Sequence, residues 1–342
     1  MRTIIYIPPL PRTSGGIAVL YQLATRLREL GKDCFFVSSG NTAEKVPGLA
    51  EQKEKGGRQL EWSVDGSFLS PEDIYIVPEG WPNALAPGLA AGCHCIVYVQ
   101  NWAFLHSGLP HGVRWQQLPV KFIAVSQPVS WFLQEIAHLQ VEGVVRPSLD
   151  GKLFAPSGKS GKTLRIAWMP RKNKALAEQI KTVTEVALGG KNHPPLEWVE
   201  IHRMSQEAVA EELGKSHIFL CTGFPEGLAL PPLEAMASGC LVVGFSGFGG
   251  WDYMRDARCE GQPRLSPTEF SLREVPWGGN GYFAMDGDIL GAALALKEAI
   301  LTTEESASCR NGIIAAARQT AQAYSSDAQM NEIASLWNRL ES

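Results

Sequence analysis

The sequence lacks the features that mark membrane-spanning, secreted and nucleic-acid-binding proteins. No hydrophobic run is long enough to cross a bilayer, and the short apolar stretch near the N-terminus is interrupted by prolines before it could form a signal-peptide core. Lysine and arginine are scattered along the chain, and the formal net charge is −4. The basic surface that would bind a nucleic-acid backbone is therefore not expected.

The sequence also lacks paired cysteine motifs. Its seven cysteines form an odd set without Cys-x-x-Cys spacing. The triplet Cys93-His94-Cys95 has no second ligand pair of the kind that a structural zinc site needs. We therefore expect a reduced, cytoplasmic protein with no metal site and no tightly bound cofactor. Peripheral contact with the inner face of the membrane is left open.

What is present is a repeated alternation of short apolar runs and helical patterns. With 342 residues, 45% of them hydrophobic and 19% charged, the chain is long enough for two globular α/β domains. The first forty residues predict a strand, a glycine-containing loop, a helix and a second strand. The strands expected along the chain are Ile4–Ile7, Asp33–Ser38, Ile74–Val77, Ile96–Val99, Phe122–Val125, Leu164–Trp168, Leu196–Ile201, Ile218–Cys221 and Leu241–Phe245. A Pro- and Ser-rich stretch at 144–157 predicts the linker between the two domains.

Three glycine-containing segments were considered as phosphate-binding loops. Thr13-Ser14-Gly15-Gly16 lies between the first strand and the first helix, where free amides favour an anion, although a simple helix cap explains it equally well. Gly161-Lys162-Thr163 is not a nucleoside-triphosphate loop, because proline occupies the position of the first glycine and a strand follows. The glycines of 244–250 lack the spacing of dinucleotide enzymes.

The segment 218–245 carries two carboxylates between two predicted strands. Glu226 falls in a Gly- and Pro-rich loop, and Glu234 falls near the first turn of a short helix. Ligands of parallel α/β sheets bind at the carboxyl edge, which is where this loop begins. An acidic residue early in a helix also complements the helix dipole, so spacing alone leaves a structural role for Glu234 open.

The run from Pro225 to Gly239, PEGLALPPLEAMASG, resembles the signature of glycosyltransferase family 4, in which seven residues separate two glutamates. Other parts of the chain resemble the family in the same order, namely Gly15-Gly16, the strand ending at Ser126, the segment with Asp150 and Phe154, and Arg171-Lys172. The resemblance implies the GT-B fold, with two Rossmann-like domains facing a central cleft. It assigns 1–146 and a returning helix at about 322–342 to an acceptor domain, and 147–321 to a donor domain.

The resemblance also implies an activity. A retaining transferase would move a sugar from a nucleoside-diphosphate sugar to a glycan, lipid-linked or small-molecule acceptor, without an essential metal. Charge grows on the diphosphate as it leaves, and cations and amides must neutralise it. Glu226 would bind the sugar and Glu234 the ribose hydroxyls. The expected diphosphate ligands are Arg171, Lys172, Lys174 and the backbone of Gly15, Gly16, Gly227, Leu228, Ala229 and Leu230.

One departure from the family concerns the N-terminal domain. Many members carry a histidine after a strand near the sugar, whereas the matching strand end here reads Tyr98-Val99-Gln100-Asn101-Trp102. Asn101 is our candidate for the catalytic group, and Gln100, His106 and His111 are alternatives. The missing histidine also leaves a second hypothesis, a non-catalytic nucleotide-sugar-binding partner of an active transferase.

Overall fold

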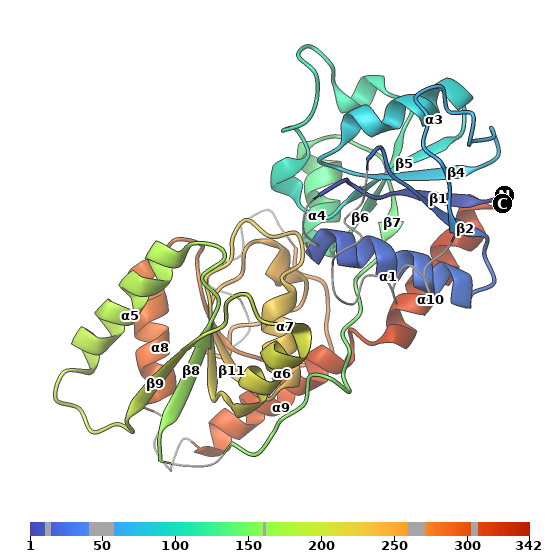
Figure 1. The fold of residues 1–342 in the computed structure, drawn as a ribbon. Coiled ribbons are helices and arrows are strands. Elements are labelled where there is room, and N and C mark those ends of the chain that lie inside the picture. The colour runs from blue at the N-terminus through green and yellow to red at the C-terminus, as the bar shows by residue number, and fades with distance from the viewer. Residues whose placement is uncertain (11–14, 41–57, 160–161, 259–270, 302–306) are drawn as a thin grey trace. The chain divides into compact units, whose positions relative to one another are not determined.

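The computed structural model describes residues 1–10, 15–40, 58–159, 162–258, 271–301 and 307–342. Two units are distinguished within it: unit 1 contains Met1–Ser148 and Ser326–Ser342, and unit 2 contains Leu149–Ser325 (Figure 1). Each unit has a parallel sheet covered by helices on both faces. This arrangement confirms the prediction of two Rossmann-like α/β domains.

Unit 1 is built on a seven-stranded sheet with the order β3-β2-β1-β4-β5-β6-β7, in which all neighbouring pairs are parallel. The chain starts at β1 and builds the sheet in both directions, so the strand order reverses between β1 and β4. The central strands are short apolar runs because both of their faces are covered. The bounds are β1 Thr3–Tyr6, β2 Cys34–Val37, β3 Arg58–Gln59, β4 Ile74–Pro78, β5 His94–Val99, β6 Lys121–Ala124 and β7 Val141–Val144.

The helices of unit 1 include one from the far end of the sequence. Helices α1 and α10 pack side by side against the sheet (Figure 1). Trp337 of α10 is fully buried, and its indole N–H donates to the Thr3 hydroxyl of β1 at 2.9 Å. The end of the chain is thus part of the core of unit 1. The helices are α1 Gly15–Glu29, α3 Ala86–Ala91, α4 Gln127–Trp131 and α10 Ser326–Leu340, with single turns at η1 Pro82–Leu85, η2 Trp102–Phe104, η3 Trp115–Gln117 and η4 Phe132–Ile136.

Unit 2 has a five-stranded parallel sheet with the order β12-β11-β10-β8-β9. Helices α5 and α8 cover one face, and α6, α7 and α9 cover the other (Figure 1). The strands are β8 Leu164–Trp168, β9 Leu196–Glu200, β10 Ile218–Cys221, β11 Leu241–Phe245 and β12 Tyr282–Ala284. The helices are α5 Lys174–Leu188, α6 Gln206–Lys215, α7 Leu230–Ala237, η5 Gly249–Asp252, α8 Ile289–Ile300 and α9 Ala307–Gln322.

Three strands were not predicted from the sequence. β3 has only two residues and β12 three, which is too short for a hydrophobic pattern to show. β7 contains Glu142 and Gly143 and is only half-buried, so it has no apolar run. Each of the three lies at the edge of its sheet. In β7 the weaker burial leaves a weaker sequence signal, whereas β12 is buried and was missed because it is short.

Candidate functional site

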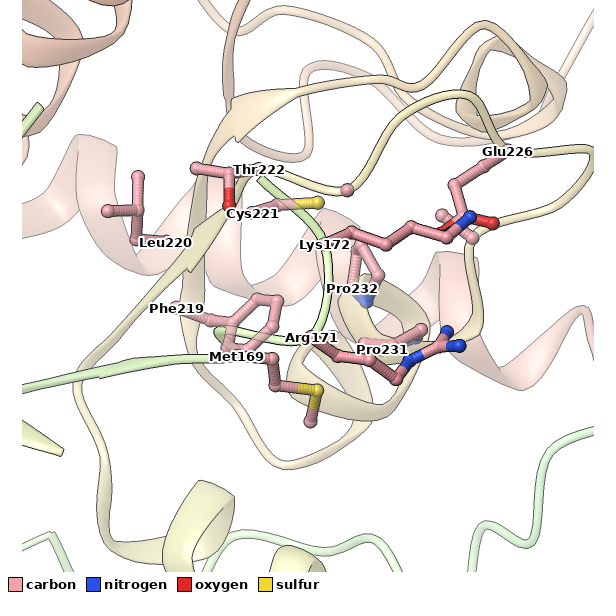
Figure 2. A pocket seen from close by; sticks show the side chains of 12 residues that line it. Met169, Arg171, Lys172, Phe219, Leu220, Cys221, Thr222, Glu226, Pro231 and Pro232 are labelled. Carbon is pink, nitrogen blue, oxygen red and sulfur yellow. Dashed lines mark ion pairs between the residues drawn. The ribbon is translucent and has the colours of Figure 1, made fainter. Parts of the chain in front are cut away.

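The strand order of unit 2 reverses between β8 and β10, the place where open α/β sheets bind ligands. The loop after β8 leads to α5 on one face, and the loop after β10 leads to α7 on the other. A partly open hollow lies at the carboxyl edge of these two strands. Figure 2 shows its walls, which combine charged side chains with apolar ones, among them Arg171, Lys172, Glu226, Met169, Phe219, Pro231 and Pro232.

An ion pair joins the two loops across this hollow. The ammonium of Lys172 lies 2.9 Å from Oε1 of Glu226 and also donates to the carbonyl of Pro225 at 2.8 Å (Figure 2). Asn173 adopts a left-handed conformation with φ 57°, and its amide donates to the carbonyls of Thr222 and Phe224. These bonds fix the loop after β8 against the loop after β10, so both charges of the pair have defined positions.

Arg171 is arranged differently from its neighbour Lys172. Its side chain is exposed and lines the hollow. Arg171 has no hydrogen bond or ion pair with any residue that the structure describes, and Figure 2 shows its guanidinium apart from the Lys172–Glu226 pair. A planar guanidinium in this state can offer both of its edges to an anion such as a phosphate.

A glycine-rich turn after β11 holds the backbone of Glu226. The Glu226 amide donates to the carbonyl of Gly247 at 2.9 Å, and the amide of Gly249 donates to the carbonyl of Glu226 at 3.1 Å. A Cβ atom on Gly249 would overlap the carbonyl oxygen of Gly227, so only glycine permits this approach. The amide of Gly247 in turn donates to Asp286 at 2.8 Å. Asp286 was missed in the sequence because it follows the unpredicted strand β12.

Glu234 lies in the second turn of α7, one residue beyond the position expected from the sequence. Ala229 is extended and caps the helix, so α7 begins at Leu230 and its first turn contains no acidic residue. The role of Glu234 as a dipole-complementing residue of the first turn is therefore wrong. Its carboxylate makes no hydrogen bond or ion pair with the described part of the chain, and burial raises its pKa to about 7.

Some predicted phosphate ligands do not line the hollow. Lys174 is the first residue of α5, and its ammonium lies 3.7 Å from Glu178 and 4.0 Å from Glu200 of β9. The start of α7 also offers fewer amides than a typical helix, because Pro231 and Pro232 occupy its first turn. Of the predicted segment 227–230, Ala229 is the residue that lines the hollow.

The predicted residues of unit 1 lie at the carboxyl edge of its own sheet. Gly15 and Gly16 form the start of α1, and nothing lies within 4 Å of the place where a Cβ atom of Gly15 would be. Thr13 and Ser14 are outside the described residues. Asn101 follows β5 and is buried, with Oδ1 accepting from the amide of Ala103 at 3.1 Å. The alternatives His106 and His111 are exposed.

Sequence analysis missed one acidic residue at this edge. Glu79 is only 5% exposed and directly follows β4. Its two oxygens accept the amides of Gln100 at 3.1 Å and Asn101 at 2.8 Å. Burial raises its pKa to about 7 against the opposing effect of these amides. An acidic residue directly after a central apolar strand was the signal that could have identified it.

The described residues offer neither a metal site nor a membrane-spanning helix. No group of three or more His, Cys, Asp or Glu side chains is placed to hold a metal ion there. Over the same residues, no helix combines the length and the apolar character needed to cross a membrane.

No model of a protein family matches the chain. The chain is 28% identical over 241 residues, 70% of each protein, to an alpha-1,6-glucosyltransferase of Actinobacillus pleuropneumoniae serotype 7 (strain AP76).

Solved structures share the fold at lower sequence identity. A glycosyltransferase of Rickettsia africae matches with a TM-score of 0.70 and 14% identity, over 99% of this chain and 98% of that one. The pneumococcal O-GlcNAc transferase GtfA, in complex with UDP and GlcNAc, matches with a TM-score of 0.54 and 13% identity, over 81% of this chain and 58% of that one. The chain therefore has the fold of the GT-B glycosyltransferases, and these similarities together support a glycosyltransferase enzyme.

Proposed function

We propose that the chain is a retaining glycosyltransferase of family 4 that transfers a sugar from a nucleoside-diphosphate sugar to a hydroxyl acceptor. The observation that carries this proposal is the hollow at the switch point of unit 2. It combines Arg171, whose guanidinium has no partner among the described residues, with the Lys172–Glu226 ion pair. Unit 2 is the donor domain, and unit 1 is the acceptor domain.

The charges of the hollow suit a diphosphate leaving group. When the bond between sugar and diphosphate breaks, negative charge accumulates on the phosphate oxygens, and cations already in place lower the barrier. Arg171 supplies a permanent positive charge with fork geometry, and Lys172 supplies a second cation. Because Lys172 is paired with Glu226 in the free protein, donor binding would divide this lysine between the carboxylate and a phosphate. The amides of Gly15 and Gly16 would add neutral donors from the start of α1.

The two carboxylates have separate roles in the proposed donor complex. Glu226 stands at the hollow and accepts hydrogen bonds from hydroxyls of the transferred sugar. Glu234 makes no hydrogen bond or ion pair with the described residues, and its partly buried carboxylate could accept hydrogen bonds from the ribose hydroxyls. Asn101 of unit 1 is the proposed polar catalytic group beside the sugar, in the place where family members carry histidine.

Two of the similar proteins suggest which donor to test first. The pneumococcal transferase was solved with UDP, and the Actinobacillus protein is named as a glucosyltransferase that makes an alpha linkage. UDP-glucose carries its glucose in an alpha linkage, so an alpha product from it corresponds to retention. We propose UDP-glucose as the donor, no metal in the chemical step, and a glycan, a lipid-linked sugar or a small molecule as the acceptor.

A non-catalytic binding partner is not proposed. That hypothesis would gain support from the loss of a donor-site carboxylate or of the Arg-Lys pair. Arg171, Lys172, Glu226 and Glu234 are all present, and the first three line one hollow.

Calorimetric titration tests the donor site directly. The protein is titrated with UDP, GDP, ADP and dTDP and with their common sugar conjugates, first without metal and then with Mg²⁺. We expect saturable binding of UDP and UDP-glucose without metal. If transfer follows, NMR of the anomeric carbon in the product distinguishes retention from inversion. Binding of none of these nucleotides under either condition would refute the donor site.

A further inference from the structure

The strand order of unit 1 also reverses, between β1 and β4, so this sheet has a switch point of its own. Glu79 is the first residue after β4 and stands at that edge. It is one of the few buried acidic residues of the described chain, and no basic side chain forms an ion pair with it there. A buried carboxylate without a cation is costly, and that cost calls for an explanation.

The side chain of Glu79 contacts the backbone of the residues that directly follow the neighbouring strand β5. β4 and β5 pair in parallel as far as Pro78 and Tyr98, and beyond this point the backbone of β4 turns away. The next amides of the β5 chain, those of Gln100 and Asn101, are then held by Oε2 and Oε1 of Glu79. The carboxylate thus replaces the missing strand and satisfies two backbone donors at once, one of them buried and the other part-buried.

Of the acidic and amide side chains, only a carboxylate has two acceptor oxygens for these two amides. A glutamine offers one acceptor oxygen, and its NH₂ group would face the second amide as another donor. The two bonds to Glu79 therefore fix the Gln100–Asn101 peptide in position and in rotation. Because Oδ1 of Asn101 also accepts from the amide of Ala103, the orientation of the whole Asn101 side chain follows from the backbone that Glu79 holds.

We propose that Glu79 is a positioning residue for the sugar-transfer reaction, holding the exit of β5 so that Asn101 is fixed at the carboxyl edge of the unit 1 sheet. This inference rests on the proposed function, in which Asn101 lies beside the reacting sugar. Glu79 itself is too deeply buried to serve as the main contact for a substrate.

The test compares Glu79→Gln and Glu79→Ala with a matched control, Glu72→Gln. Glu72 is an exposed acidic residue just before the start of β4, so its substitution removes the same charge near the opposite end of the same strand. Two quantities are measured for each variant: kcat and KM with UDP-glucose, and amide hydrogen exchange of peptides covering 96–104. Melting temperatures identify any variant that has simply lost its fold.

We expect kcat to fall by about ten- to a hundredfold in Glu79→Gln and further in Glu79→Ala, with little change in KM for the donor, because a small displacement of a catalytic group is enough for such losses. Exchange of the Gln100 and Asn101 amides should accelerate by about tenfold in Glu79→Gln and by more in Glu79→Ala. In an Asn101→Ala background, Glu79→Gln should cause little additional loss of kcat.

Three results would overturn the proposal. They are unchanged amide exchange in both Glu79 variants, faster exchange with kcat unchanged, and an equal loss of kcat with and without Asn101. If the wild-type protein transfers no sugar at all, the proposed function fails and the kinetic role falls with it. The exchange comparison would still decide whether Glu79 holds the β5 exit.

Discussion

The two sheets of this protein have the same kind of switch point but different chemistry at it. At the edge of unit 2, Arg171, Lys172 and Glu226 present their charges to a hollow. At the edge of unit 1, the carboxylate of Glu79 is buried and bonded to its own backbone. Topology therefore determines where a ligand can bind, and the loop residues determine what kind of ligand it is. The charges of the first edge are the kind that the proposed diphosphate requires, whereas the carboxylate of the second edge is occupied by backbone amides.

The carboxylates of Glu79 in unit 1 and Glu234 in unit 2 differ in the same way. Burial raises the pKa of both Glu79 and Glu234 to about 7. Glu79 accepts two amides from its own chain, whereas Glu234 accepts none from the described residues. The side chain of Glu234 is only partly buried, so water can reach it in the free protein and a ligand that brings donors can take the place of that water. Glu234 therefore fits a binding role, and Glu79 fits a supporting one.

The largest effect is expected from Glu226→Gln, which removes the negative charge from the unit 2 edge. Glutamine cannot pair with Lys172 as an ion and is a weaker acceptor for sugar hydroxyls, so kcat/KM for the donor should fall by roughly 100-fold or more. The measurement is donor-dependent release of UDP.

Glu178→Gln is the matched control for Glu226→Gln, since Glu178 is an exposed acidic residue of α5 whose contact is with Lys174. Its activity should stay close to wild type. A Glu226→Gln variant with normal melting and near-normal kcat/KM would mean that this carboxylate does not take part in transfer.

Arg171→Ala should have the next largest effect. The loss of a charge-assisted bond to phosphate should weaken UDP binding by about 1.5–3 kcal/mol, which calorimetry can measure. Uridine, which has no phosphate, should bind wild type and variant equally. An equal loss for uridine and UDP would show that Arg171 acts on the shape of the site and not on the phosphates.

The folded sheets and the central site residues follow from local sequence signals. The predicted strands 164–168, 218–221 and 241–245 have the bounds observed for β8, β10 and β11, because each is a buried apolar run between clear turn residues. Glu226 was placed at the carboxyl edge because it follows the predicted strand 218–221, and Arg171 was assigned from the resemblance to family 4; the two residues follow β10 and β8, which pair in parallel. Proximity in the fold could therefore be predicted from order in the chain.

Other features depend on contacts that no local pattern records. Glu79 bonds to amides 21 and 22 positions later, and only the parallel pairing of β4 with β5 brings them together. The surroundings of Lys174, a predicted diphosphate ligand, also depend on such contacts. The lysine opens α5, and its side chain lies beside Glu178 of the same helix and Glu200 of β9 instead of the hollow.

Glu234→Gln should show a smaller effect that changes with pH. Burial raises the pKa of Glu234 from 4.5 to about 7, so between these values the folded state binds more protons than the unfolded state and its stability falls as pH rises. Above pH 7 the partly buried carboxylate is ionised, and glutamine avoids the cost of that charge. The variant should therefore be more stable than wild type by about 1 kcal/mol at pH 8.5, with little difference at pH 4.5.

Urea unfolding at the two pH values measures this difference, and UDP binding at pH 8.5 should be weaker in the variant despite its greater stability. Exposed Glu178→Gln serves again as the control and should shift stability little at either pH. If Glu234→Gln is less stable than wild type at pH 8.5, the carboxylate has a stabilising partner in the protein. It would then not be available to accept hydrogen bonds from a ligand.

The smallest effect is expected from Lys174→Ala, although this lysine lies only three residues from Arg171 in the chain. Its ammonium lies 3.7 Å from Glu178 and 4.0 Å from Glu200 in half-exposed surroundings, and such surface pairs contribute about 0–1 kcal/mol to stability. UDP affinity should change less than about twofold, because Lys174 does not line the hollow. Calorimetry measures the UDP affinity of both Lys174→Ala and Arg171→Ala, and so compares two cations that lie close together in the sequence. A loss as large as that of Arg171→Ala would show that Lys174 moves to the phosphates when donor binds, and the charged edge of unit 2 would then extend to the start of α5.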